Sequence, residues 1–394
     1  MKKQLLITGG GIGGMAGALA AQRAGWDVRL FEQAAVFSEV GAGVQLGPNV
    51  VRCLQAWGLQ KALQDVAVFP ERLVVRSATT GDELGQLTLG QTAIQRYGAA
   101  YASIHRADLH SLLARAVAQT DAQVQLGQSI AEFTDNGEVV TLRNQRGTQV
   151  EGDALLGADG LWSRTRTALL ADGAPRVSGH LAYRALLPQS ALPLALRSAQ
   201  VTAWMGPHLH AVQYPVRRGE LQNLVVIIEG AAPQDLQNWD HSANAADLDR
   251  ALAGTCTALQ DVVRSVADAG WGWRLWPLCD RPPVAGPDAM ARGLVALLGD
   301  AAHPMRPYLA QGAGMAIEDA FELEKVLSMH DLEVPLRLRR YALNRWERNA
   351  RVQARSIRNG RIFHATGVVR WGRDLAMQAL GERLLDVPWL YRGR

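Results

Sequence analysis

Short apolar runs alternate with helical segments at the beginning of the chain. Residues 5–8 and 28–31 are apolar runs of strand length, and the Ala-rich segment 13–24 lies between them and ends at Gly25. A buried strand, a helix rich in small residues and a second strand at this spacing are typical of a βαβ unit with parallel strands. The pattern therefore predicts that the chain begins as a Rossmann-like nucleotide-binding domain.

The same kind of buried strand returns twice, far along the chain. Residues 154–158 run into Asp159-Gly160, and residues 294–298 run into Gly299-Asp300. The first domain is therefore predicted to be discontinuous, because the chain leaves it and comes back. Further strands are predicted at residues 73–76, 84–89, 124–126, 130–133 and 139–143, and helices at residues 49–57, 108–118 with Asp108 as N-cap, 245–266, 314–329 and 335–360.

The pattern changes between residues 177 and 230. The segments LAYRALLP, VTAWMG, HLHAVQYPV and LVVIIEG alternate in polarity, which predicts an antiparallel sheet in a separate lobe. The expected fold is α/β. It has a Rossmann-like domain of residues 1–70, 100–176 and 285–330, an inserted, mainly antiparallel domain of residues 71–99 and 177–284, and a C-terminal helical segment, residues 331–394.

Composition argues against several classes of function. The 394 residues carry 41 basic and 37 acidic side chains, a formal charge of +4, without a basic stripe with interleaved aromatics, so no nucleic-acid partner is predicted. Cys53, Cys256 and Cys279 are far apart and form no CxxC pair, which argues against a disulfide framework or a metal site. A reducing compartment follows. No apolar run is long enough to span a bilayer, and we expect a cytoplasmic protein.

The segment GGGIGG places Gly9, Gly11 and Gly14 between the first strand and the first helix. Glycines allow the backbone to approach a pyrophosphate, which the helix N-terminus then binds through its N–H groups and its dipole. Glu32 ends the second strand, where an acidic residue binds ribose hydroxyls in such domains. The alternatives are a glycine loop that only packs the helix on the strand and a surface carboxylate. This motif does not distinguish FAD from NAD.

Asp159 and Asp300 both follow a buried strand and precede a helix. Each carboxylate would either cap the next helix or accept a hydrogen bond from a sugar hydroxyl, such as those of a ribityl chain. The second interpretation favours FAD over NAD.

These segments resemble the single-component, FAD-dependent aromatic hydroxylases, the para-hydroxybenzoate hydroxylase-like flavoprotein monooxygenases. Within this class the chain is most similar to 3-hydroxybenzoate 6-hydroxylases, with 6-hydroxynicotinate 3-monooxygenases and salicylate hydroxylases nearby. The resemblance covers essentially the whole chain. It is carried by residues 9–14, 157–166 and 299–320, and by GAGVQLGPNV (41–50), IHRADLH (104–110), GHLAYRAL (179–186), GPHLHAVQYP (206–215) and WLYRG (389–393).

The resemblance implies a tightly but non-covalently bound FAD, with the antiparallel domain holding the substrate. Asp300 would bind the ribityl chain, and Arg106 the ribityl chain or the phosphates. Asp159 would serve the second nucleotide-linked motif with Arg166, for which an exposed helix charge is the alternative. Further expected contacts are Leu126 with the adenine, Val44 and Gln45 beside the isoalloxazine ring, and Gly312 and Ala313 at a helix N-terminus facing its pyrimidine ring.

The resemblance also implies the reaction. NADH or NADPH, bound transiently, reduces the flavin, and O2 then forms a flavin C4a-hydroperoxide that hydroxylates a phenolic aromatic acid ortho or para to its hydroxyl. The phenol needs a base. His210 is the candidate, and Tyr214 shares its strand face, because residues 208, 210, 212 and 214 alternate with the opposite face. His208 is interpreted as structural. The alternative for His210 and Tyr214 is an ordinary half-buried sheet face.

The substrate itself is less closely defined. Pro307 matches a family position whose carbonyl approaches the substrate hydroxyl, but the most similar enzymes carry Gln nearby. Gln45 and Tyr308 stand where the hydroxynicotinate enzymes have His. A hydroxypyridine, a hydroxynicotinate or a larger natural-product aromatic therefore remain alternative substrates, and a non-catalytic FAD-binding redox sensor is an alternative function. WGWRLWP (271–277) fails the halogenase pattern at its last positions. The family suggests a homodimer.

Overall fold

The chain forms two compact units in the computed structural model, which describes residues 2–37, 42–238, 241–242 and 245–393. Unit 1 comprises Met1–Glu39, Leu109–Arg176 and Cys279–Ile357, and unit 2 comprises Val40–Asp108, Val177–Leu278 and Arg358–Arg394. Gly41, the first residue of one family motif, lies outside the described residues. The domain boundaries expected from the sequence stay a prediction, because the units are defined by packing and not by which ligand each segment binds.

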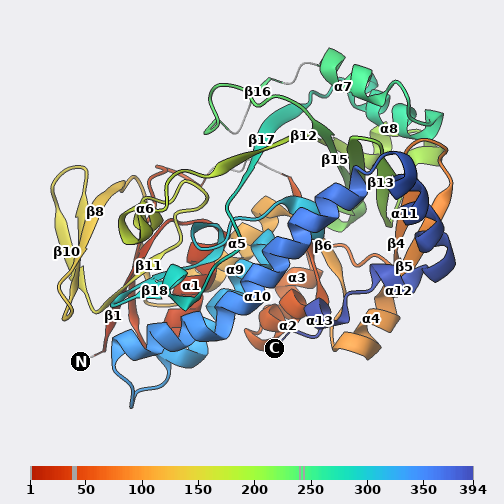
Figure 1. Ribbon diagram of the computed structural model, residues 1–394. Coiled ribbons are helices and arrows are strands. Elements are labelled where there is room, and N and C mark those ends of the chain that lie inside the picture. The colour runs from red at the N-terminus through yellow and green to blue at the C-terminus, as the bar shows by residue number, and fades with distance from the viewer. Residues whose placement is uncertain (1, 38–41, 239–240, 243–244, 394) are drawn as a thin grey trace. The chain divides into compact units, whose positions relative to one another are not determined.

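Unit 1 is built on a six-stranded sheet (Figure 1). Its order is β18 (Ala291–Arg292), β19 (Val295–Leu297), β11 (Ala154–Gly157), β1 (Gln4–Thr8), β2 (Asp27–Phe31) and β7 (Gln123–Gln125). All neighbours are parallel except β18 and β19. The helix α1 (Ile12–Arg23) connects β1 to β2 and packs against α9 (Gly312–Leu327). The predicted βαβ start and both returning strands are therefore present in one sheet.

The remaining elements of unit 1 surround this sheet. They are a three-stranded sheet of β8 (Ile130–Asp135), β9 (Val140–Asn144) and β10 (Gln149–Gly152), the helix α6 (Arg164–Leu170), the short 3-10 turns η4 (Pro287–Ala289), η5 (Gly299–Ala301) and η6 (Pro307–Leu309), and most of α5 (Arg106–Ala118) and α10 (Val334–Phe363). Asp108 is not the N-cap of α5, because the helix begins two residues earlier. Its carboxylate instead accepts hydrogen bonds from Arg217.

Unit 2 is built on an eight-stranded sheet that is mainly antiparallel, as expected. Only β4 and β13 run parallel among its assigned pairs. Its order is β16 (His241–Ser242), β17 (Arg274–Asp280), β12 (Arg176–Pro188), β15 (Leu221–Glu229), β14 (Leu209–Val216), β13 (Val201–Gly206), β4 (Arg72–Ser77) and β5 (Glu83–Thr88).

One face of this sheet is buried by α7 (Ala245–Leu252) and α8 (Thr257–Asp268). Leu259, Val262, Val263 and Val266 recur at helical spacing and pack on Leu209, Ala211 and other residues of the strands. The single helix predicted over residues 245–266 is wrong, because the chain breaks between α7 and α8 and Cys256 becomes the N-cap of α8.

The other elements of unit 2 are short. β3 (Gly43–Leu46) pairs with β6 (Ala102–His105), and the helices are α2 (Pro48–Ala56), α3 (Gln60–Gln64), α4 (Gly90–Tyr97), α11 (Gly367–Leu380), α12 (Glu382–Leu385) and α13 (Pro388–Tyr391), with the 3-10 turns η1 (Gln189–Ala191), η2 (Leu194–Leu196) and η3 (Arg217–Gly219). Within the described part of the chain, no helix is both long and apolar enough to cross a membrane.

Candidate functional site

The glycine loop of unit 1 is shaped by close backbone contacts. Gly9 has φ +96°, and its N–H donates to the carbonyl oxygen of Phe31. A Cβ on Gly14 would lie 1.8 Å from the carbonyl oxygen of Gly9, so no side chain fits there. Gly11, the N-cap of α1, faces open space and contributes no side-chain cap to the helix. The loop thus leaves the α1 N-terminus open to an anion, as a pyrophosphate requires.

Glu32 lies beside this loop, directly after β2. Its two carboxylate oxygens accept hydrogen bonds from the N–H groups of Gly10, at 2.6 Å, and Ala34, at 2.8 Å. Leu126 directly follows the adjacent strand β7 and is half-buried. His110 of α5 contacts the carbonyl oxygen of Gly10 at 2.7 Å, a contact that the sequence did not suggest. Glu32 therefore braces the glycine loop and, with Leu126, lies at the carboxyl edge of the parallel sheet.

Asp159 and Arg166 organise the second motif. Asp159 accepts hydrogen bonds from Ser163 Oγ at 2.6 Å and from the N–H and hydroxyl of Thr165 at 3.0 Å. Arg166 is buried, so the alternative of an exposed helix charge is wrong. Its guanidinium donates to Asp172 and to the carbonyl oxygens of Ala301 and Ala302, the residues that follow Asp300. Arg166 of the second motif thus holds the backbone of the third motif directly after Asp300.

A buried ionic network contacts the loop that carries Asp300 and holds it in place. Asp319 of α9 accepts hydrogen bonds from the N–H of Gly299, from His303, from Arg345 and from Asn349. Glu318 accepts from Arg345 and Arg348. Burial would raise the pKa of Asp319, but His303 and Arg345 hold it well below its usual range. Glu318 and Asp319, at the end of the third motif, therefore hold the loop that contains Gly299 and Asp300 in place.

The third motif presents its polar groups near the start of α9. Asp300 is exposed, and its Oδ1 lies 3.9 Å from the position of a Cβ on Gly312, so the two residues are close. Gly312 and Ala313 form the first turn of α9, which has no side-chain cap and no acidic residue in that turn. Pro307 and Tyr308 lie in η6, where Pro307 is half-buried and Tyr308 is buried. Two open helix N-termini, an exposed carboxylate and a glycine loop in one unit fit FAD.

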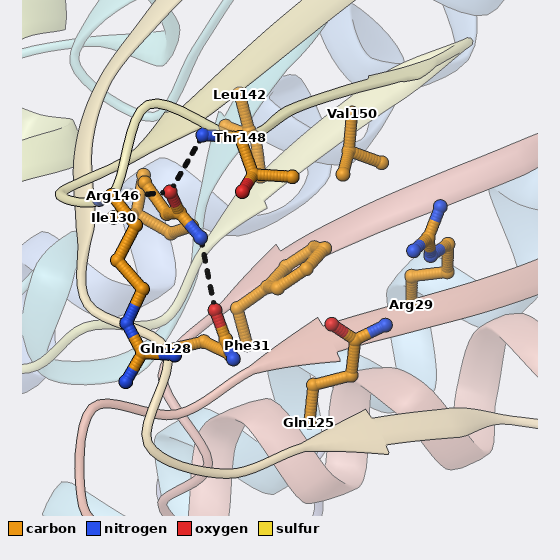
Figure 2. A pocket seen from close by; sticks show the side chains of 10 residues that line it. Arg29, Phe31, Gln125, Gln128, Ile130, Leu142, Arg146, Thr148 and Val150 are labelled. Carbon is orange, nitrogen blue, oxygen red and sulfur yellow. Dashed lines mark hydrogen bonds between the residues drawn. The ribbon is translucent and has the colours of Figure 1, made fainter.

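A separate pocket of about 180 Å3 opens on unit 1 (Figure 2). It is bounded by β2, β7 and the three-stranded sheet, and the side chain of Asn144 donates to that of Gln128 at 3.0 Å. Its lining contains neither histidine nor carboxylate, so it offers no group for proton transfer. The lining residues are Arg29, Phe31, Gln125, Gln128, Ile130, Leu142, Asn144, Arg146, Thr148 and Val150.

His210 and Tyr214 share one face of the unit 2 sheet, the face opposite to α7 and α8. Strand register extends this face across β14, β15 and β12: His210 pairs with Ile227, which pairs with Ala182, and Tyr214 pairs with Asn223. Arg184, two residues after Ala182 on β12, is therefore on the same face. Both His210 and Tyr214 are buried.

Gln45 lies against the Tyr214 end of this face. Its side-chain oxygen accepts a hydrogen bond from the Tyr101 hydroxyl at 2.5 Å, and its side chain is also hydrogen-bonded to Tyr214. Gly43 approaches so closely that a Cβ would lie 2.5 Å from the Tyr214 ring, and its N–H donates to Asn223. Burial raises the pKa of Tyr214 to about 12, against Arg184 and Gln45, which lower it, so Tyr214 remains a hydrogen-bond donor at neutral pH. Val44 is half-buried on the same strand.

Arg184 brings a positive charge to this face. Its guanidinium carbon lies 3.6 Å from the centroid of the Trp276 ring, and its Nε is buried with no hydrogen-bond partner among the described residues. Burial lowers the pKa of Arg184 to about 10, with Arg106 lowering it further and Tyr214 opposing, so the group stays protonated at neutral pH. Arg106 itself is exposed at the start of α5.

A cluster of polar residues adjoins His210, with His364 in direct contact with it. Nδ1 of His210 lies 2.7 Å from Nε2 of His364, and the His364 ring stacks on His180 at 4.6 Å between centroids. Nδ1 of His364 lies 3.5 Å from Oε1 of Glu229. His208, the residue interpreted as structural, has φ +59° in the turn before β14 and contacts Glu229.

The face thus combines an imidazole, two phenolic hydroxyls and a half-buried guanidinium, which can accept a proton, hold an oxygen and bind an anion. Arg184 was within a quoted motif but had no assigned role. Tyr101, His180 and His364 carry no local sequence signal, because each meets its partner only through the fold.

Comparison with known proteins extends over the whole chain. A family described as FAD binding domain matches residues 2–356. A 3-hydroxybenzoate 6-hydroxylase of Polaromonas naphthalenivorans (strain CJ2) is 37% identical over 391 residues, 98% of this chain and 95% of the relative. A 6-hydroxynicotinate 3-monooxygenase of Bordetella bronchiseptica is 34% identical over 360 residues, 89% of this chain and 90% of the relative. A solved salicylate hydroxylase substrate complex has a TM-score of 0.83 at 27% identity and covers 100% of this chain and 96% of its own. These matches confirm the expected fold class.

Proposed function

The chain belongs to the FAD binding domain family, and from this premise we propose that it is an NAD(P)H-dependent monooxygenase that hydroxylates a phenolic aromatic acid. The family match confirms FAD as the cofactor. The relatives named above are hydroxylases and monooxygenases of aromatic rings, and their similarity spans nearly the full length of this chain. NADH or NADPH would be a transient co-substrate, and O2 would supply the hydroxyl oxygen.

Unit 1 supplies the residues proposed to bind the nucleotide end of FAD. The open N-terminus of α1 would bind the pyrophosphate, and Asp300 the ribityl chain. Asp159 would act through Thr165 and Ser163, because its carboxylate already accepts hydrogen bonds from both. The full proposed set is Gly9, Gly11, Gly14, Glu32, Leu126, Asp159, Asp300, Gly312 and Ala313 in unit 1, with Val44 and Arg106 in unit 2.

The chemistry of unit 2 suits a phenol. Bound FAD supplies the activated oxygen, and the ring becomes reactive when its hydroxyl loses a proton. His210 would accept that proton, and the hydroxyl of Tyr214 would donate a hydrogen bond to the phenolate. Gln45 would orient Tyr214, and Pro307 and Tyr308 are proposed to contact the substrate.

One observation carries the choice of an acid as substrate. Arg184 is a protonated guanidinium on the same sheet face as His210 and Tyr214, and its Nε has no partner among the described residues. A cationic group whose donor atom is withdrawn from water is costly unless an anion accompanies it, and a planar carboxylate matches a guanidinium. A hydroxybenzoate meets both needs: its phenol reaches the base and its carboxylate reaches the cation.

A panel of hydroxybenzoates, hydroxynicotinates and hydroxypyridines tests this proposal. We expect a hydroxybenzoate to accelerate NADH or NADPH oxidation, to consume O2 and to yield a product with one more hydroxyl group. A hydroxynicotinate as the only hydroxylated compound would move the substrate to the alternative class. Flavin reduction that no aromatic acid accelerates would contradict a hydroxylase and favour a redox sensor. The homodimer and the cytoplasmic location stay predictions.

A further inference from the structure

We propose that His364 and Glu229 form a proton path that connects His210 to solvent, with His364 as the positioning residue that orients His210. This inference rests on the proposed function, because it concerns the proton that the phenol would give to His210. All of its residues belong to unit 2. Nothing in the motifs that characterise the chain includes His364, which lies 154 residues from His210 in sequence.

The path runs from a buried group to an exposed one. His210 is 3% exposed and His364 5% exposed, whereas the side chain of Glu229 is 43% exposed and that of His208 66%. The successive distances are 2.7 Å from His210 Nδ1 to His364 Nε2, 3.5 Å from His364 Nδ1 to Glu229 Oε1, and 2.8 Å from Glu229 Oε2 to His208 Nδ1. A base in a pocket that excludes water needs such an exit, because each turnover delivers a proton to it.

The contacts select one set of tautomers. The carboxylate of Glu229, 3.5 Å from Nδ1 of His364, favours the tautomer with its hydrogen on that nitrogen, and Nε2 of His364 is then an acceptor. Nδ1–H of His210 donates to that nitrogen, which leaves Nε2 of His210 with its lone pair. The arrangement therefore presents His210 as a base. Burial first, then the charges of His364 and His180, hold the pKa of His210 well below its usual range, so the ring is neutral at pH 7.

The proton balance closes over one turnover. The phenol proton moves to Nε2 of His210, the Nδ1 proton of His210 moves to Nε2 of His364, and the Nδ1 proton of His364 moves to Glu229 and then to water. Each ring gains one proton and loses one, so both imidazoles stay neutral, and the only new charge is that of the phenolate. When the ring oxygen of the product is reprotonated, the transfers run in reverse and restore the starting tautomers.

The surrounding residues hold His364 in place. The N–H of His208 donates to the carbonyl oxygen of His364 at 3.1 Å, and Arg373 of α11 donates to the carbonyl oxygens of Ile362 and Phe363. His180 of β12 stacks on the ring with an interplanar angle of 7°. His208 keeps a left-handed backbone, which in a non-glycine residue persists only where surrounding contacts hold it.

A metal ion is the competing occupant of this cluster. One ligand atom each of His180, Glu229 and His364 lie within 4.8 Å of one another. A cation on Nδ1 of His364 would place the hydrogen on Nε2 of that ring, and this hydrogen would then face Nδ1 of His210. His210 would carry its own hydrogen on Nε2 and could not accept the phenol proton. The two interpretations therefore predict opposite tautomers of His210.

The test compares His364→Gln and Glu229→Gln with Glu220→Gln, which replaces an exposed carboxylate of the same unit that pairs with Arg218. The measurements on the FAD-loaded enzyme are bound flavin, substrate Kd, product formation against pH, and the ultraviolet phenol-to-phenolate transition of bound 3-hydroxybenzoate. We expect H364Q to keep FAD and to change Kd less than twofold, but to slow hydroxylation roughly tenfold or more. E229Q should also slow hydroxylation, because the proton loses its route to solvent, and E220Q should behave as wild type.

The double variant His210→Asn with His364→Gln separates a proton path from a structural role. If His364 acts through His210, it has no further effect in the H210N background, so the two losses do not add. Additive losses, or a wild-type pH profile in H364Q and E229Q, would overturn the path while leaving a hydroxylating wild type and its proposed function intact. Activity lost on EDTA dialysis and restored by Zn²⁺ would also overturn it, in favour of the metal.

Discussion

Arg184 is the residue on which the preference for a negatively charged substrate is expected to depend. We expect Arg184→Gln to raise KM for a hydroxybenzoate by roughly tenfold to a hundredfold, because a charge-assisted hydrogen bond is lost. KM for the corresponding hydroxybenzamide should change little, since that substrate has no carboxylate. Steady-state kinetics with both compounds check this, with Arg197→Gln as the control, because the guanidinium of Arg197 donates to the backbone carbonyl oxygens of Leu192 and Ser190. Equal effects on acid and amide would show that Arg184 does not bind the carboxylate.

His210 is the residue on which the phenol proton depends. We expect His210→Asn to retain FAD and to lower hydroxylation roughly hundredfold. The loss should be largest at low pH, because without a base the phenol must ionise unaided, and it should shrink as pH approaches the phenol pKa. Product formation across pH 6 to 9 measures this. A variant that forms product at the wild-type rate would remove His210 as the base.

Residue roles followed from the sequence only where a motif marked them. Gly9, Glu32 and Asp300 stand at strand ends in quoted motifs, and the alternation of β14 placed His210 and Tyr214 on one face. Contacts between distant segments had no such marker. Asp319 was part of a recognised motif, yet its four buried donors come from residues 299 to 349 and could not be read from spacing.

Helix α9 owes its position to a buried ionic network rather than to apolar packing alone. Asp319 is fully buried and accepts hydrogen bonds from Arg345, His303, Asn349 and the N–H of Gly299. We expect Asp319→Asn to lower the free energy of unfolding by about 3 kcal/mol, because Arg345 loses a buried counter-charge. FAD should also dissociate more readily, since Asp319 holds Gly299 beside Asp300.

Denaturant titration and flavin release by gel filtration measure the two effects. Glu347→Gln, an exposed position on α10, is the charge-matched control and should leave both unchanged. An Asp319→Asn enzyme as stable as the control would mean that the network contributes no net stability, as well-packed replacements of buried ion pairs sometimes show.

Element boundaries show what a hydrophobic period can and cannot reveal. The buried strands were found because an apolar run ending at an acidic residue is a local signal. The break between α7 and α8 was missed because Leu248 and Leu252 before it and Leu259 and Val262 after it pack on the same core, so the helical period continues across the break. Asp108 was predicted to be the N-cap because Asp is a common capping residue, whereas nothing in the local sequence indicates that the helix already begins at Arg106.

The whole molecule carries neutral imidazoles at buried positions, which makes its stability depend on pH. Burial first, and then His180, lower the pKa of His364 to about 4, below the unfolded value near 6.5. Between these pH values the unfolded chain binds a proton that the folded chain does not bind. The contribution of His364 to the free energy of unfolding is therefore fully present above about pH 6.5 and is lost as the pH falls toward 4. Between pH 7 and 5 this one group should cost ~2 kcal/mol of the free energy of unfolding.

Urea titration of the FAD-loaded enzyme at both pH values measures the loss, and His364→Gln should lose less stability over that interval because Gln does not titrate. Lys61→Gln, an exposed substitution in the same unit, should lose as much as wild type. An equal loss in H364Q and wild type would mean that His364 is already protonated in the folded enzyme at pH 5.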